Sequence, residues 1–179
     1  MVIIGDDAYP INTDFRVGIA FCEKLISGEP MSVQEMYELW FPEKQPDDVS
    51  AAQAAIFAFY RCGKEPGKQG TKQVPAYDFF TDGDNIVADF QREYGIDLTT
   101  EKMHWWRFSA LLGGLLSHSF TEKVQYRNCD LNEIESKRMR GRYRKLQQEY
   151  ALAPDGKPVR RPQTLEEYQE LLLKQARGE

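Results

Sequence analysis

Residues 99–116, TTEKMHWWRFSALLGGLL, decide the fold of this chain. At 100° per residue their apolar side chains cover almost every side of a helix, and a helix that is apolar all round is a buried one. The adjacent Trp105 and Trp106 would project about 100° apart, so each needs a different neighbouring element to pack against. We therefore expect a central helix with other elements packed on at least two of its sides.

This helix organises the predicted core. His104 shares a face with Phe108 and Leu115, so we expect a hydrogen-bonded, mostly buried histidine rather than a general base, which would need a partner and a cleft. The predicted core consists of Phe15, Phe90, Tyr94, His104, Trp105, Trp106, Phe108, Leu112 and Leu115.

The composition fits one domain, or one domain with a tail. The chain has 179 residues, of which 41% are hydrophobic and 12% aromatic, which is enough for a sizeable core. Its three cysteines, Cys22, Cys62 and Cys129, are isolated and odd in number, which indicates a reducing compartment rather than a disulfide framework or a zinc site. The longest apolar run, residues 110–116, is far shorter than the ~18 residues that cross a bilayer. We expect a cytoplasmic protein without a membrane partner.

The order of the elements predicts an all-α fold: a mainly helical, bundle-like single domain with a small N-terminal β-hairpin. Residues 2–12 place apolar residues on both sides of a Gly-Asp-Asp turn, which predicts the hairpin. We expect a helical domain over residues 1–152, a basic linker over 153–163, and a C-terminal helix over 164–179 that is docked or frayed.

Capping residues mark the expected starts of the helices. Thr13 or Asp14 opens the first helix, Asp47 or Asp48 the third, and Asp82 or Asp84 the one that ends near Tyr94. Ser32 with Glu35, Ser119 with Glu122, and Asp130 with Glu133 are three capping boxes. The last two predict a short helix over 120–127 and a long one over 131–150.

We find no pattern typical of catalysis. Asp82 and Asp84 lack the alternating oxygen ligands and the closing glutamate of a calcium loop, so they are interpreted as helix caps near the positive end of the dipole. The cysteines have no activating neighbour, and the paired glycines Gly113 and Gly114 are not followed by the Lys-Ser/Thr of a phosphate loop. We expect no catalytic residue, no cofactor and no metal.

A basic segment carries the main surface signal. Residues 137–161 hold nine Lys or Arg against two acids, in a chain of formal net charge -5. On a helix, a basic flank would border an apolar stripe, which suits an acidic protein partner or nucleic acid phosphates, although a solvated helix face explains the pattern too. The candidate partner-binding residues are Arg138, Met139, Arg142, Tyr143, Lys145 and Tyr150.

The chain resembles the bacteriophage gene-product-fifteen family of phage and prophage tail gene clusters. The resemblance is carried by Tyr-Gly-Ile-Asp-Leu at 94–98 with the Met-His-Trp-Trp-Arg-Phe block from Met103. It extends upstream through residues 11–16 and 59–63, and downstream as far as residues 150–152. It covers most of residues 9–152 and fades beyond them.

The resemblance implies a small non-enzymatic protein of long-tailed phages, suspected to be a tail assembly chaperone in the bacterial host cytoplasm. Such a chaperone would hold the aggregation-prone, helical tape measure protein in solution, and a homo-oligomer is compatible with that role. The alternatives are a nucleic-acid-binding protein that uses the basic segment, which we consider less favoured, and a minor structural component of the virion.

Overall fold

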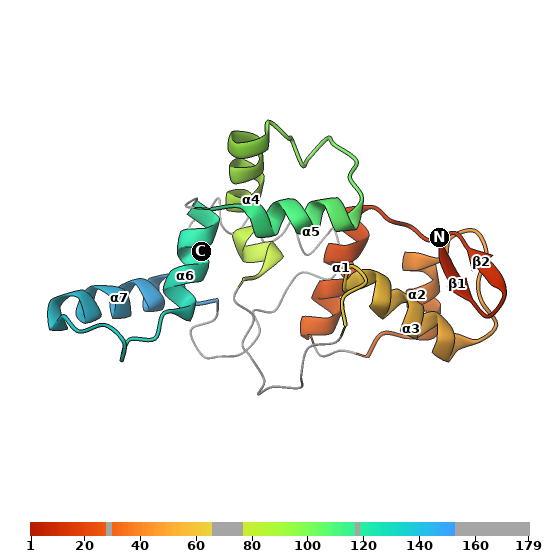
Figure 1. The fold of residues 1–179 in the computed structure, drawn as a ribbon, viewed down its shortest axis with the longest axis horizontal. Helices are drawn as coiled ribbons and strands as arrows, with labels where there is room; N and C mark the ends of the chain where they lie inside the picture. Colours follow the sequence, from red (N-terminus) through yellow and green to blue (C-terminus); the bar gives the residue numbers. More distant parts are fainter. Residues whose placement is uncertain (28–29, 66–76, 117–118, 153–179) are drawn as a thin grey trace, which may run out of the picture.

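We describe the fold from a computed structural model, which covers residues 1–27, 30–65, 77–116 and 119–152. Over these residues the chain forms a hairpin and seven helices: β1 (Val2–Ile4), β2 (Asp7–Tyr9), α1 (Phe15–Ser27), α2 (Val33–Trp40), α3 (Val49–Tyr60), α4 (Phe79–Tyr94), α5 (Trp105–Gly114), α6 (Ser119–Asn128) and α7 (Lys137–Glu149). The predicted fold class is thus confirmed. Figure 1 shows the hairpin at one end of the long axis and α7 at the other. The predicted linker 153–163 and the helix 164–179 lie outside the described residues.

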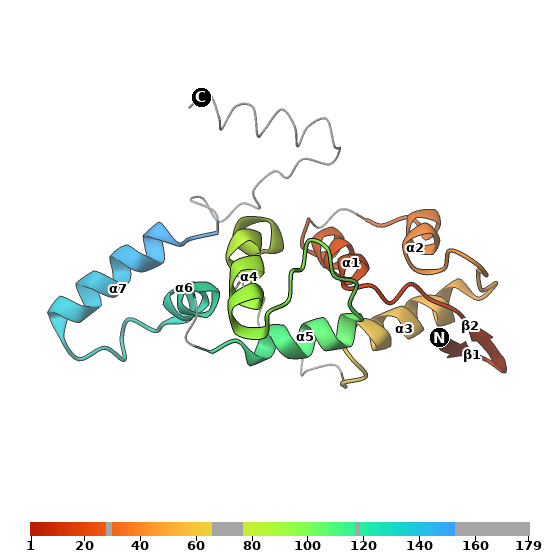
Figure 2. The same ribbon diagram turned by 90° about the horizontal axis from the view of Figure 1, so that it is seen from above.

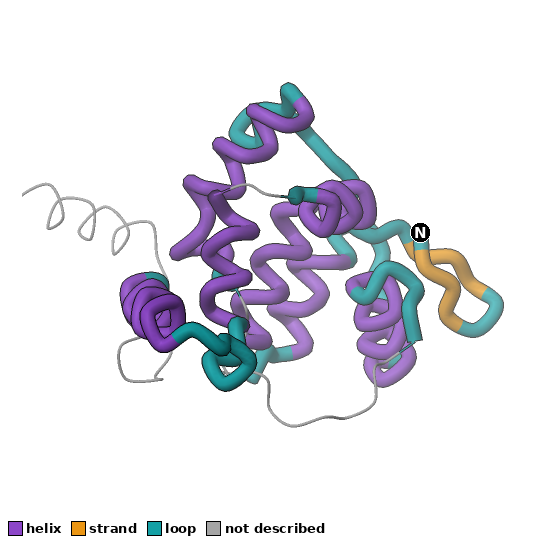
Figure 3. The backbone as a smooth tube through the Cα atoms, turned by 60° about the vertical axis from the view of Figure 1, so that its left-hand side comes forward, coloured by secondary structure: helices purple, strands orange, loops and turns teal. Residues whose placement is uncertain are grey.

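The N-terminal hairpin depends on α3 for support. Its strands pair antiparallel with Val2 opposite Tyr9, and Gly5 supplies the positive φ of +62° that the turn needs. Strand β1 lies against α3 and buries Val2. Because two strands alone are marginal in water, this helix contact explains how the hairpin persists. It is the sole strand structure among the described residues (Figure 3).

Two predicted helix starts are confirmed. Glu35 donates its backbone N–H to the Ser32 hydroxyl, and its carboxylate accepts the Ser32 backbone N–H, which completes the capping box of α2. Asp48 caps α3 by accepting the backbone N–H of Ala51 at 3.0 Å.

The start of α4 was predicted wrongly. Asp78, rather than Asp82 or Asp84, caps this helix by accepting the backbone N–H of Thr81 at 2.7 Å. The helix therefore begins about one turn earlier than expected, which places Asp82 inside it. Gly95 ends the helix in the left-handed conformation, as predicted.

The central helix α5 is shorter than residues 99–116, because it begins at Trp105. Asp97 accepts both the backbone N–H and the hydroxyl of Thr99, and such local side-chain bonds compete with helix formation. His104 is extended and serves as the N-cap, with its Nδ1 accepting the Trp106 N–H at 3.1 Å.

A short backbone bridge holds the starts of α1 and α5 together. The N–H of Phe15 donates to the carbonyl of Met103 at 2.9 Å, and the N–H of Trp105 donates to the carbonyl of Thr13 at 2.8 Å. The bridge joins segments about ninety residues apart, so the two helices enter the core side by side.

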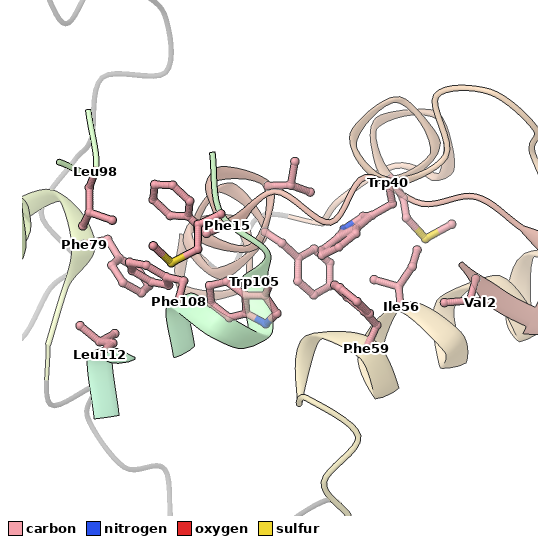
Figure 4. Close-up of a cluster of buried hydrophobic side chains, with 14 of the residues drawn as sticks. Val2, Phe15, Trp40, Ile56, Phe59, Phe79, Leu98, Trp105, Phe108 and Leu112 are labelled. Atoms are coloured by element: carbon pink, nitrogen blue, oxygen red, sulfur yellow. The ribbon is translucent and has the colours of Figure 1, made fainter. Parts of the chain in front are cut away.

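The core is aromatic along α5 (Figure 4). Phe108 is fully buried, and its ring stacks on Phe15 at 4.7 Å and on Phe90 at 5.3 Å between ring centroids. These rings join three helices in one cluster. The predicted core residues that are buried are Phe15, Phe90, Trp105, Phe108, Leu112 and Leu115.

Three predicted core residues are not fully buried. His104 is exposed because α5 begins after it, so its ring turns back onto the helix start. Trp106 is 43% exposed, because α1 packs on the side of α5 that carries Trp105. Tyr94 is half-buried and donates its hydroxyl to the Leu111 carbonyl. The helix is therefore buried on one side rather than all round.

The crossing of α1 and α5 depends on Gly18. A Cβ placed on this residue would lie 2.2 Å from Cε3 of Trp105, which is far inside van der Waals contact. The indole is itself fixed by its neighbours, so it has little room to retreat. Gly18 therefore allows the two helices to approach at this point.

We expect Gly18→Ala to lower the free energy of unfolding by about 1–3 kcal/mol, because it overfills the crossing. Alanine is the better helix former by about 1 kcal/mol, so local propensity predicts the opposite sign. Gly83→Ala is the matched control, since a Cβ on that residue of α4 meets nothing within 4 Å. Urea unfolding of both variants measures the difference. A Gly18 variant as stable as the Gly83 variant would contradict the close crossing.

Candidate partner-binding surface

The residues with reactive or metal-binding side chains are scattered over the fold. His104 caps α5 at the surface, and its ring lies beside the ring of Phe59. Cys22, Cys62 and Cys129 lie on different segments, are each half-buried, and form no disulfide among the described residues. Among the described residues, no three histidine, cysteine or acidic side chains come together as a metal site would require.

Two buried carboxylates on α4 attach α6 to the core. Asp82 is fully buried and accepts two hydrogen bonds from the guanidinium of Arg127, at 2.7 and 2.9 Å. Asp89 is also fully buried and accepts the backbone N–H of Phe120 at 2.8 Å, together with a contact from Arg92. One carboxylate thus holds the beginning of α6 and the other holds its end.

Asp82 is not the N-cap of α4, although its carboxylate accepts the backbone N–H of the N-cap residue Asp78 at 3.1 Å in addition to the bonds from Arg127. Asp82, Ile86 and Asp89 share one face of α4 at i, i+4 and i+7, and all three are buried. This spacing was the available signal, because it places both carboxylates on the face that carries the apolar residues. The partner Arg127 lies 45 residues away, so local spacing could not identify it.

The end of α7 is attached to α6 through the same arginine. The Nε of Arg127 donates to the carbonyl of Tyr150 at 2.5 Å, and the Tyr126 ring lies 6.0 Å from that of Tyr150 and 5.4 Å from that of Tyr143. Gln147 adds a hydrogen bond to the Cys129 carbonyl at 2.6 Å. The apolar stripe predicted to meet a partner therefore lies largely against α6.

The helix α7 begins later than predicted. The backbone N–H groups of Asn132 and Glu133 both bond to Asp130, which makes a turn where the long helix was expected to start. Ser136 then caps α7 at residue 137. The guanidinium of Arg140 donates twice to the Ile134 carbonyl, at 3.1 and 2.6 Å, so this arginine braces the turn.

The outward side of α7 is a basic face. It carries five exposed cations, for which the described residues supply no ion pair, and Gly141 leaves its middle without a side chain. Met139 lies at its edge and is 40% exposed. No residue of α7 is buried, and Figures 1 and 2 show it projecting beside α6 at the end of the molecule. The basic face consists of Lys137, Arg138, Arg142, Arg144 and Lys145.

The six predicted partner-binding residues are thus divided by the structure. Arg138, Arg142, Lys145 and Met139 are exposed, whereas the rings of Tyr143 and Tyr150 contact α6. A partner on the basic face would be recognised chiefly through charge, with Met139 as the apolar contact on this helix.

A second surface feature is an apolar pocket between α5 and α6, with a volume of about 380 Å³. Burial raises the pKa of Tyr60 and that of Tyr77 in its wall, so both phenols stay neutral. The pocket could take an apolar side chain, and it is not among the sites predicted from the sequence. Its lining residues include Tyr60, Tyr77, Trp105, Leu112, Leu115, Phe120 and Val124.

Fold and surface together describe a small, mainly helical protein with an exposed basic helix. Compared with protein families, the chain matches the one described as Bacteriophage Gp15 protein over residues 1–152. It belongs to this bacteriophage family, which confirms the resemblance. Comparisons with curated proteins and with solved structures find no match. Within the described residues, no helix has the length and hydropathy needed to cross a bilayer.

Proposed function

We propose that this protein is a non-enzymatic phage tail assembly protein, which acts in the bacterial cytoplasm as a chaperone or adaptor for the tape measure protein. Membership of a bacteriophage family supports the setting. The observation that carries the binding role is the basic face of α7, whose five exposed cations lack an ion-pair partner among the described residues. A surface of this kind suits a partner with acidic side chains.

The attachment of α7 supports such a role. Arg127 and the ring of Tyr126 hold this helix in one orientation, so a partner does not have to order it on binding. Exposed charges steer encounter over about 8 Å at physiological ionic strength and add little to residence time. A chaperone needs this combination, because it must capture a long helical chain quickly and release it during assembly.

Nucleic acid binding is the second candidate, and the same cations favour it because phosphates attract any basic helix. The formal net charge of -5 opposes it, since the rest of the chain repels a polyanion. Salt-sensitive DNA binding by the purified chain at physiological ionic strength would support this candidate over the first.

Reversing three charges on α7 should weaken capture of the tape measure protein. In co-expression, we expect the wild-type chain to keep the tape measure protein soluble. The triple variant Arg138→Glu, Arg142→Glu, Lys145→Glu should lose roughly tenfold or more of the pull-down at low salt, and less at high salt, where charges are screened.

The control variant reverses three exposed cations elsewhere, Lys64→Glu, Lys102→Glu and Arg107→Glu, and changes the net charge equally. It should pull down as much tape measure protein as the wild type. Equal loss in both triple variants would mean that net charge rather than the basic face governs binding. No loss in the α7 variant would place the partner elsewhere.

A further inference from the structure

The end of the molecule opposite α7 is acidic. The hairpin turn and the loop between α2 and α3 expose five carboxylates against one cation, Lys44. This lysine lies 3.9 Å from Asp7 and over the ring of Tyr9, so it offsets one of the five negative charges. We call this surface the acidic end; it consists of Asp6, Asp7, Glu43, Asp47 and Asp48.

The acidic end has a fixed shape. Phe41, at the start of the loop, is fully buried against the ring of Tyr9, and the Tyr37 hydroxyl donates to the Pro46 carbonyl at 2.6 Å. The first contact holds the start of the loop beside the hairpin, and the second holds its later part against α2. Burial, and after it the nearby charges of Asp47 and Asp48, raise the pKa of Tyr37, which agrees with carboxylates held close to the loop anchor.

The two charged surfaces lie at opposite ends of the same molecule. Figures 1 and 2 show the hairpin and α7 at the two extremes of the long axis in both views. The basic face of one molecule is therefore remote from its own acidic end. Each surface also exposes an apolar side chain, Met139 on α7 and Ile3, at 68% exposure, on the hairpin.

We propose that the basic face of α7 in one copy of this chain docks on the acidic end of a second copy. The two surfaces carry opposite net charge, since the acidic end keeps an excess of carboxylates even with Lys44 beside Asp7, and both surfaces are held in place before contact. The basic face and the acidic end are different surfaces, so one docked copy can bind the next in the same way. Repeating the contact builds a row of copies, or closes on itself as a ring or an antiparallel pair. Self-association and a separate protein partner would compete for the same α7 face. The proposal does not depend on the identity of that partner.

The purified full-length chain tests this by sedimentation or light scattering over a concentration series. At about 0.02 M salt the mean mass should rise with concentration above that of one chain, and at about 0.5 M salt it should return to one chain, because the screening length falls severalfold. A constant single-chain mass at low salt, or association that salt does not weaken, would overturn the proposal.

Two reversed variants identify the surfaces. The α7 triple variant described above removes the basic face, and Asp6→Lys, Glu43→Lys, Asp47→Lys reverses three exposed carboxylates of the acidic end. Each variant alone should remain a single chain at low salt. An equal mixture should associate again, because each reversed surface then meets its complement. This rescue excludes misfolding as the reason for the loss.

The control variant with Lys64, Lys102 and Arg107 reversed has the same net charge as the α7 variant and should still associate. If either single variant associates as the wild type does, or if the mixture fails to associate, the docking surfaces are wrong. The acidic-end variant retains α7, so its capture of the tape measure protein should be intact. Failure of self-association is thereby distinguishable from failure of the chaperone role.

Discussion

Trp105→Ala should lower the free energy of unfolding by about 3–5 kcal/mol, among the largest effects of any single substitution in this chain. The side chain is only 5% exposed, its ring stacks on Tyr60 at 5.2 Å, and its indole N–H donates to the Tyr60 carbonyl at 2.7 Å. Truncation would leave a cavity between α1, α3 and α5. It would also leave that carbonyl without this donor. Denaturant unfolding followed by far-ultraviolet circular dichroism measures the loss.

Trp106→Ala is the matched control, because it removes the same side chain from the next position. Trp106 is 43% exposed, although its indole N–H also donates to a backbone carbonyl, that of Phe59 at 2.8 Å. Because folding buries much less of the Trp106 side chain, its removal should lower the free energy of unfolding by roughly half as much as removal of Trp105, or less. Equal destabilisation by the two substitutions would show that both sides of α5 are covered in solution.

Arg127→Met should destabilise the fold by about 3–5 kcal/mol, because it leaves the fully buried Asp82 without its cation. The same change removes the hydrogen bond to Tyr150, so hydrogen exchange in α7 should quicken as well. Adding Asp82→Leu should recover part of the lost stability, since an apolar pair carries no unpaired buried charge.

Arg92→Met provides the comparison for this prediction. Arg92 also contacts a buried carboxylate on the same helix, that of Asp89, but its own side chain is 57% exposed. Each carboxylate retains one backbone N–H, that of Asp78 for Asp82 and that of Phe120 for Asp89, so the two variants differ in the exposure of the arginine. For the exposed Arg92 the expected cost is about 1 kcal/mol or less. If Arg127→Met were equally mild, the pair with Asp82 would be solvated rather than buried.

Sequence spacing predicted the features that depend on residues close together in the chain. The capping box of Ser32 and Glu35 spans four residues, and the buried face of Phe108, Leu112 and Leu115 spans about two turns of helix. Both could be predicted because the interacting groups are neighbours along one element.

Features that depend on distant residues could not be predicted in the same way. In the sequence Gly18 is indistinguishable from an ordinary helical glycine, and only the structure shows that Trp105 packs against it. The basic helix was recognised as a candidate site, but which side of it faces outward depends on α6. Because the rings of Tyr143 and Tyr150 pack against Tyr126 of α6, the outward side of α7 is the more polar one.

The backbone bridge between the starts of α1 and α5 also bears on how the chain is made. Residues 13–15 cannot form it until residues 103–105 have been synthesised, which at ordinary translation rates takes roughly ten seconds. During that interval the apolar side of α1 lacks its principal cover. The nascent chain must therefore stay soluble while its first helix waits for α5.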